Sequence, residues 1–360
     1  MSERRKILLR TVPFLLVGVL VFIVYLALFV NISEMIVVIQ RANMLIYSLA
    51  AVALMLETFF FTLNWQHLLL PLSVKVPLKK AFTYVWVGIF ADLLIPAESV
   101  SGEVARAYLM SKEPEANSGK IIASLVGQRM LGTITTTVTL FVCFLGLLTL
   151  NYSVSSLMLQ ILVSVTIITA AAFAFLVAVC VKEKWTERLV NGAMRFAERL
   201  SRGRFKLEHF QTKIVDALRA FHNSLRTFGS EPIKLISPTL FYVLAWVASI
   251  AIVFLVFAAI GYTEPNIQVF VLKVIVVYTL LVAIKSIPIG VPAEVGLPDI
   301  LMTTLFILFG IPPDISAATT ILTRILTVWL RFFVGFAAIQ WLGVKTLMES
   351  GVFGKPKDTL

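Results

Sequence analysis

The chain has 360 residues, of which 59% are hydrophobic and only 14% are charged, and its mean hydropathy is +0.93. A water-soluble domain of this length does not use so much apolar surface in its core, so the composition excludes a soluble protein and indicates an integral membrane protein. The formal net charge of +11 does not indicate nucleic acid, because cytoplasmic loops of membrane proteins are rich in lysine and arginine and face anionic lipid. We therefore expect no nucleic-acid partner.

Long apolar runs follow one another along the chain and lack the two-residue alternation of a membrane β-barrel. A run of about 20 residues crosses the hydrocarbon core of a bilayer as a helix. The first run follows the basic start MSERRKILLR and is too long for a signal peptide, so we interpret it as a retained helix. Continuous helices are predicted over residues 11–30, 43–64, 120–149, 155–181, 235–260, 269–286 and 316–343. The predicted fold class is an all-α polytopic membrane protein with about seven full transmembrane helices.

Two further hydrophobic segments are interrupted by proline and glycine. The first, about residues 81–111, contains AFTYVWVGIFADLLIPAESVSGEVARAYLM, and the second, about residues 287–311, begins with IPIGVPAEVGLPD. The predicted backbone breaks are Pro96, Gly102, Pro292 and Gly296. Lipid cannot satisfy backbone groups freed at membrane depth, so such breaks are buried in protein or line a wet cavity. Paired interruptions in two halves of a chain are typical of a transporter's binding site.

Lysine and arginine predict the orientation through the positive-inside rule. They precede the first helix, follow the second and end the chain, so we expect both termini in the cytoplasm. Lysines flank residues 81–111 on both sides, which predicts a re-entrant segment, whereas residues 287–311 are expected to cross as a loop and a short helix. The predicted organisation is an N-terminal transmembrane half, a basic cytoplasmic linker, a C-terminal transmembrane half and a cytoplasmic tail, over residues 1–181, 182–234, 235–345 and 346–360.

The linker contains apolar residues at spacings of three and four, which predicts one apolar stripe along a helix. They are Leu207, Phe210, Ile214, Leu218, Phe221, Leu225 and Phe228. We expect this basic amphipathic helix to lie on the cytoplasmic leaflet. A calmodulin-like partner site is the alternative.

Charged side chains in and beside the broken segments are the candidate substrate-binding residues: Glu103, Arg106, Arg129, Glu294, Asp299 and Arg324. Glu103 and Arg106, three residues apart, share a helix face, and Asp299 lies where a helix dipole favours an anion. A lone charge at mid-membrane costs about 3 kcal/mol on insertion scales, so Arg324 needs a partner, for which Glu294 and Asp299 are the candidates. Arg331, seven residues further on, is predicted on the same helix face, and Arg129 has no obvious local acid.

Two interpretations of these charges stay open. The acids and arginines either neutralise one another as structural ion pairs, or the arginines converge on a cavity and bind an anionic headgroup through their planar guanidinium groups. Glu57, in the middle of the second predicted helix, is either a proton-coupling carboxylate or the counter-ion of one of the arginines.

Several motifs of common chemistries are absent from the sequence. It contains no GxxxxGK[ST] loop, no GxSxG elbow, no HExxH and no DxD pair. Cys143 and Cys180 fall in apolar helices, and the three histidines lack metal-ligand spacing. We expect a transporter without catalytic residues, metal or cofactor, and no ATP motor within this chain.

Over roughly residues 10–345 the chain resembles the membrane domain of the lysylphosphatidylglycerol synthases and their stand-alone flippase-like relatives. ADLLIPAESVSGEVARAYLM resembles the family's Pro…Gly-Glu-x-x-Arg element, and SLVGQRML resembles a Glu-Arg element, with Gln128 where an acid is usual. PAEVGLPDILMTTLFILFGIPPDISAATTILTRIL resembles a Pro-Gly-Gly-x-Gly-x-x-Glu segment with a downstream arginine, although Ala293-Glu294 replaces Gly-Gly and Asp299 replaces Glu. The resemblance implicates Pro96, Gly102, Glu103, Arg106, Arg129, Pro292, Gly296, Asp299 and Arg324.

In the bifunctional relatives a soluble domain attaches an amino acid to a lipid and the membrane domain moves the product. Only about 15 residues follow the last predicted helix, so we expect no synthase half here. The resemblance implies a flippase that moves an anionic phospholipid or a lipid-linked sugar across the plasma membrane. The alternative is an accessory or catalytic membrane subunit of polyprenyl-phosphate-dependent glycosylation. The implied partners are the lipid or lipid-linked saccharide and a separate synthase or glycosyltransferase.

Overall fold

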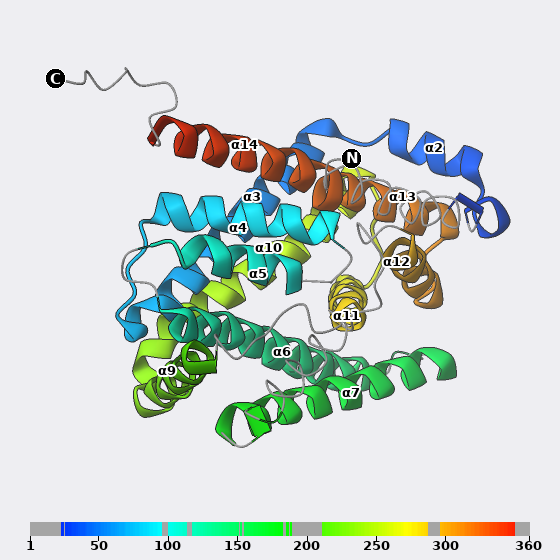
Figure 1. Cartoon of the computed structure of the whole chain (residues 1–360). Helices are drawn as coiled ribbons and strands as arrows, with labels where there is room; N and C mark the ends of the chain where they lie inside the picture. The colour runs from blue at the N-terminus through cyan, green and yellow to red at the C-terminus, as the bar shows by residue number, and fades with distance from the viewer. Residues whose placement is uncertain are drawn as a thin grey trace, which may run out of the picture.

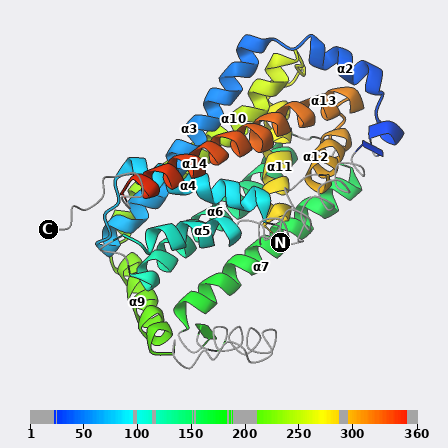
Figure 2. The same cartoon turned by 45° about the horizontal axis from the view of Figure 1, so that its top comes forward.

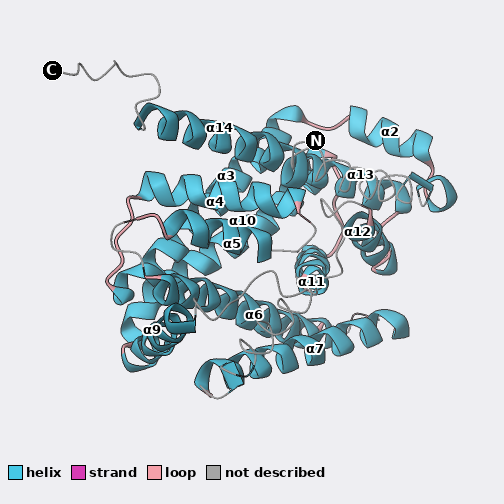
Figure 3. Ribbon diagram, viewed as in Figure 1, coloured by secondary structure: helices cyan, strands magenta, loops and turns pink. Residues whose placement is uncertain are grey.

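The computed structural model of the chain describes residues 23–24, 26–95, 100–113, 117–150, 152, 155–182, 185–186, 188, 211–286 and 296–349. All regular elements within these ranges are helical, and no strand occurs among them (Figure 3). The predicted all-α fold class is therefore confirmed. Several residues of the sequence predictions lie outside the described ranges, namely Pro96, Pro292, Glu294, Leu207, Phe210 and most of the predicted first helix at 11–30.

The helices of the described ranges follow one another with short connections. In the N-terminal half they are α2 (Ile32–Gln40), α3 (Met44–Leu69), η1 (Leu70–Leu72), α4 (Leu78–Leu94), α5 (Val100–Met110), α6 (Ser118–Thr149) and α7 (Ser156–Val181). After them come α9 (Gln211–Ser230), η3 (Pro232–Leu235), α10 (Ile236–Ala259), α11 (Ile267–Lys285), α12 (Leu297–Leu308), α13 (Pro313–Arg324), the π-helical turn η5 (Ile325–Leu330) and α14 (Arg331–Glu349).

Six helices among the described residues are long and apolar enough to cross a membrane: Met44–Leu72, Ser118–Thr149, Ser156–Val181, Pro232–Ala259, Ile267–Lys285 and Pro313–Gly343. They correspond to six of the seven predicted spans, and the remaining prediction, residues 11–30, lies mostly outside the described ranges. Most apolar side chains of α7 are not buried within the protein, as expected of a helix that contacts lipid. The chain is thus built as a polytopic membrane protein.

Asparagine side chains begin several of these long helices. Asn43 accepts hydrogen bonds from the backbone amides of Leu45 and Ile46, at 3.0 and 3.2 Å. Asn117 begins α6 in the same way, with 2.9 Å to the amide of Gly119, and Asn266 begins α11. The first amides of a helix have no partner inside it, so a side-chain acceptor at this position sets where an apolar run becomes helical.

The helices form interlocking pairs. Helix α3 packs along α10, so the second predicted helix of the N-terminal half lies against the first of the C-terminal half (Figure 2). Helix α14 covers α4, and α4 and α5 form a hairpin above α6 (Figure 1). Helix α6 also contacts α7, α9 and α11. Elements of both halves therefore surround the α4–α5 hairpin.

The hairpin of α4 and α5 is the first interrupted segment, and its interruption is confirmed. Its two outer ends lie together: Lys80 Nζ, at the start of α4, is 2.8 Å from the Glu113 carboxylate, just beyond α5. The Tyr84 hydroxyl donates to the same carboxylate at 2.6 Å. The chain thus enters and leaves this segment at one end, as predicted for a re-entrant element; which membrane face that end meets stays a prediction.

Helix α12 is the short helix predicted in the second interrupted segment. Its 12 residues span about 18 Å, which is too short to cross the bilayer alone, and it packs on α11 and α13. Gly296 precedes it with a φ of 94°, a value that side-chain-bearing residues rarely adopt. Residues 287–295, before Gly296, lie outside the described ranges.

Helix α9 confirms the helical periodicity of the linker but not the expected position of its apolar stripe. Phe221 and Phe228 are buried among apolar residues at the end of α3 and the start of α6. The backbone of α6 is bare where α9 approaches: a Cβ on Gly119 would meet the carbonyl oxygen of Ala217, and one on Gly127 would lie 3.2 Å from the Phe228 ring. Because these glycines let α9 seat on α6, its apolar stripe contacts protein rather than lipid.

Candidate functional site

The site is built where α5 crosses α4 at two glycines. A Cβ on Gly102 would meet the Asp92 carboxylate and lie 2.6 Å from the carbonyl oxygen of Gly88, so only glycine fits there. Asp92 Oδ1 accepts hydrogen bonds from the Gly102 amide at 2.6 Å and the Ser101 hydroxyl at 2.8 Å. A carboxylate from α4 thus caps the N-terminal turn of α5, where the helix dipole favours negative charge. This crossing directs the next turn of α5, with Glu103, into the interior of the protein.

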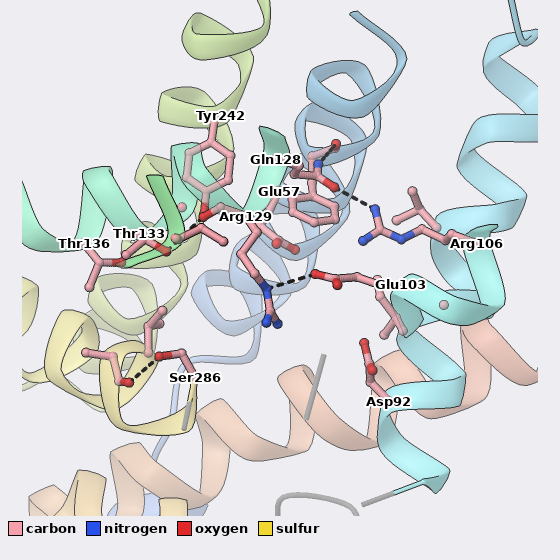
Figure 4. A pocket seen from close by; sticks show the side chains of 18 of the residues that line it. Glu57, Asp92, Glu103, Arg106, Gln128, Arg129, Thr133, Thr136, Tyr242 and Ser286 are labelled. Atoms are coloured by element: carbon pink, nitrogen blue, oxygen red, sulfur yellow. Dashed lines mark hydrogen bonds and ion pairs between the residues drawn. The ribbon is translucent and has the colours of Figure 1, made fainter. Parts of the chain in front are cut away.

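A cavity of about 430 Å³, the first cavity, opens beside this crossing between α3, α4, α5, α6, α7, α11 and α14. Its wall contains three carboxylates and three arginines: Glu57, Asp92, Glu103, Arg106, Arg129 and Arg331. Figure 4 shows Glu103 and Arg129 pointing toward each other across it, with Arg106 and Gln128 on one side. Candidate residues from three helices therefore meet in one place.

Arg106 is held without a carboxylate in direct contact among the described residues. Its Nη1 donates to Gln128 Oε1 at 2.7 Å, and its guanidinium carbon lies 5.4 Å from the Phe61 ring centroid and 5.2 Å from that of Trp65. The residue is only 7% exposed. Gln128 is fixed in turn, because its amide donates to Asn64 Oδ1 at 2.6 Å. A buried cation is thus oriented by a neutral amide and two aromatic faces.

The predicted pairing of Glu103 with Arg106 is wrong in detail. The two share a helix face, but Glu103 Oε1 pairs with Arg129 Nε at 3.1 Å, across to α6. Arg129, which seemed to lack a local acid, obtains one from the neighbouring helix because α5 lies directly on α6. The Glu103 and Arg129 side chains keep 25% and 36% of their surfaces exposed, so this ion pair is accessible from the cavity.

Glu57 and Arg331 join the two halves at the same cavity. Glu57 Oε2, in the middle of α3, lies 2.7 Å from Arg331 Nη2 at the start of α14. Of the two interpretations of Glu57, the structure has it as the counter-ion of an arginine. Arg331 was predicted on the face of Arg324, and its contact with α3 was not predicted.

Arg324 lies beside a second cavity of about 230 Å³, which shares Ile89, Asp92, Val282 and Arg331 with the first. Its Nε is 2.7 Å from Asp299 Oδ1, and the two side chains are 11% and 5% exposed. Asp299 Oδ2 also accepts from the Gly296 amide at 2.7 Å. Asp299 was one of the two predicted partners of Arg324, and this pairing is present; the other, Glu294, lies outside the described residues.

The charged candidates are thus divided between adjoining cavities. Glu103, Arg106, Arg129 and Glu57 line the first, whereas Arg324 lines the second with Asp299 behind it. Asp92 and Gln128 belong to the site but were not among the predicted residues. An aspartate inside an apolar run is itself a signal, because intramembrane charges are rare and tend to be functional. The described residues contain no cluster of histidine, cysteine and acids that could hold a metal ion.

Comparison with known proteins agrees with this architecture. The model of the lysylphosphatidylglycerol synthase transmembrane region matches residues 15–335. A UPF0104 membrane protein of Methanothermobacter thermautotrophicus is 27% identical over 83% of this chain and 86% of its own length. One from Methanocaldococcus jannaschii is 24% identical over 93% and 96% of the two chains, and one from Pyrococcus horikoshii is 21% identical over 85% and 89%.

Proposed function

The chain belongs to the family of the lysylphosphatidylglycerol synthase transmembrane region, and from this premise we propose that it is a lipid translocator. It moves an anionic phospholipid or a lipid-linked sugar across the plasma membrane, with both termini in the cytoplasm. Its substrate enters the first cavity headgroup first, and no bond of the lipid is made or broken. Family membership supports the class of protein, and the cavity supports the chemistry of the headgroup.

The observation that carries the proposal is the state of Arg106. A buried guanidinium loses its hydration, and in proteins the effective penalty is several kcal/mol unless charge compensates it. Gln128 supplies one hydrogen bond to Arg106 but no charge. A phosphate in the cavity would supply both, through paired N–H···O bonds that suit the planar fork of arginine. The buried cation is thus suited to receive an anion.

The Glu103–Arg129 pair supports the same chemistry. Both side chains are partly exposed, so a phosphate can take the place of the Glu103 carboxylate on Arg129 without first unpacking the protein. Exchange between two anions keeps Arg129 neutralised in the empty and in the loaded protein. Such exchange favours transport, because a site that releases its ligand must not leave a cation bare in a dry cavity.

The size of the cavity fits a headgroup better than a whole lipid. Its volume of about 430 Å³ lies in the ~300–1,000 Å³ range of small-molecule sites. Phe61, Val85, Ile89 and Leu176 add apolar wall between the charges. We propose that the headgroup occupies the cavity while the acyl or polyprenyl chains stay in the bilayer beside the exposed apolar helices.

The experiment is a translocation assay in liposomes without ATP. Purified protein should accelerate the movement of headgroup-labelled phosphatidylglycerol from the inner to the outer leaflet, measured by access of a membrane-impermeant quencher. Arg106→Ala should abolish the acceleration, and Arg106→Lys should recover it only in part, because lysine keeps the charge but loses the fork. The matched control is Arg41→Ala, at an exposed C-cap of α2, which should move lipid at the wild-type rate.

Two outcomes oppose the proposal. If Arg106→Ala moves the lipid as fast as wild type while remaining folded, the cavity is not the route and its charges are structural ion pairs. If purified protein moves no lipid but transfers a sugar from a polyprenyl-phosphate donor, it is a component of glycosylation instead. Circular dichroism and the thermal unfolding midpoint of each variant separate loss of function from loss of fold.

A further inference from the structure

Threonine hydroxyls in the helices of this protein bond back to their own backbone, with an exception in α13. Thr303, Thr320 and Thr327 donate to the carbonyl oxygen four residues earlier, at 2.9, 2.9 and 3.0 Å. Thr323 lies between the last two and is only 5% exposed, yet its Oγ1 has no hydrogen-bond partner in the described part of the chain. Leaving a buried hydroxyl unsatisfied costs about 1–3 kcal/mol, so a ligand that accepts from it gains that amount.

Thr323 lines the second cavity together with cationic side chains. Lys285, Arg324 and Arg331 belong to its wall, and Asp92 is the wall's carboxylate among the described residues, so the formal charge of the lining is +2 from three cations and one acid. Asp92 already accepts two hydrogen bonds from the start of α5. The acid that contacts Arg324, Asp299, is not part of the wall. The cavity therefore combines positive lining charge with an unused hydroxyl donor.

The backbone between the two arginines is unusual. The π-helical turn η5 separates Arg324 from Arg331, and such turns are rare and frequent at functional sites. Both arginines border the second cavity, and Arg331 borders the first as well. An anion could thus pass from one cavity to the other while remaining in contact with Arg331.

We propose that the second cavity is a separate phosphate-binding station, in which Thr323 donates its hydroxyl hydrogen to a phosphate oxygen beside Arg324 and Arg331. The ligand class is a phosphate oxyanion, from a lipid headgroup or from free phosphate. The station rests on the proposed function only for the claim that the phosphate arrives through the first cavity. Phosphate oxygens accept hydrogen bonds and cannot donate when ionised, so they match Thr323 and not a hydroxyl whose hydrogen is already committed.

Thr327 provides a matched comparison, because it lines the same cavity on the same face but donates to the Thr323 carbonyl oxygen. Valine has nearly the shape of threonine, so both substitutions leave the cavity size unchanged. Thr323→Val should weaken phosphate binding about tenfold or more, the value of one hydrogen bond to a charged group. Thr327→Val should change it less than twofold.

The experiment is calorimetric titration of the full-length protein in phosphate-free detergent buffer. The probes are inorganic phosphate, dihexanoyl-phosphatidylglycerol and, as a phosphate-free control, dihexanoylglycerol. All are measured in the Arg106→Ala background, in which the first cavity has lost its buried cation. Binding of inorganic phosphate that depends on Thr323 supports the station with free phosphate as sufficient ligand, whereas binding of only the short-chain lipid supports it with the headgroup as ligand.

The proposal is overturned if neither phosphate compound binds in this background, if dihexanoylglycerol binds equally well, or if Thr323→Val and Thr327→Val have the same effect. Unfolding provides a check on the premise: Thr323→Val removes an unsatisfied hydroxyl and should not lower the thermal unfolding midpoint, whereas Thr327→Val loses a hydrogen bond and should lower it. Failure of the station leaves the translocation assay with Arg106→Ala unaffected, so the two proposals fail independently.

Discussion

Removing the charge of Asp299 or Arg324 singly should destabilise the protein strongly, and removing both should cost much less than the sum. The Nε–Oδ1 distance is 2.7 Å and both side chains are nearly buried, at 11% and 5% exposure. Breaking a buried ion pair from one side costs about 3–5 kcal/mol, because the remaining charge stays buried. Since the second substitution removes that stranded charge, we expect a coupling free energy of about 2 kcal/mol or more.

The substitutions are chosen to isolate the charges. Asp299→Asn keeps an oxygen that can accept from the Gly296 amide, now bonded at 2.7 Å, so the start of α12 remains capped. Arg324→Met keeps a long side chain of similar reach. The free energy of unfolding is measured by titration with sodium dodecyl sulfate in mixed micelles, for both single variants and the double variant.

The control is the Glu231–Lys234 ion pair, three residues apart, whose side chains are 44% and 56% exposed. A solvated pair of this kind contributes about 0–1 kcal/mol, so its cycle should be nearly additive. Strict additivity at Asp299 and Arg324 would refute the claim that this pair neutralises a charge inside the membrane.

Two further predictions concern the α4–α5 hairpin and the orientation of the chain. Gly102→Ala should prevent α5 from docking and lower the yield of folded protein, because its Cβ would meet the Asp92 carboxylate; Gly343→Ala, with no atom within 4 Å of its Cβ, should be neutral or stabilising by up to about 1 kcal/mol. In a background without native cysteines, Lys112→Cys should react with an impermeant thiol reagent only from the cytoplasmic side and Thr263→Cys only from outside; labelling of position 112 from outside would contradict the predicted re-entrant orientation.

Hydropathy and helix-capping signals predict most of the fold. Apolar runs of sufficient length have one outcome in a bilayer, a helix whose backbone bonds are satisfied internally, so six predicted spans coincide with observed ones. No helix was predicted between residues 30 and 43, where α2 lies. This helix is short, and its start depends on Asn31 accepting from the Glu34 amide at 3.3 Å, a local contact that hydropathy does not register.

Pairing of charges was predictable only within one stretch of sequence. Asp299 and Arg324 follow each other closely in the chain, and the cost of a lone arginine pointed to their contact. Glu103 was matched with Arg106 because spacing along one helix was the available signal, yet its partner is Arg129 on α6. Helical spacing says which side chains share a face, and it does not say which neighbouring helix that face meets.

The Glu57–Arg331 pair shows why the cavity could not be assembled from sequence. Its members are 274 residues apart and belong to opposite halves, joined because α3 packs along α10 while α14 covers α4. The π-helical turn before Arg331 changes the rotation that an α-helical period would assign to it. An ion pair that connects the halves at the wall shared by both cavities must rearrange if the halves rock against each other, as alternating access requires. A translocator of this design therefore depends on the contacts between its halves, and sequence periodicity within each half does not contain them.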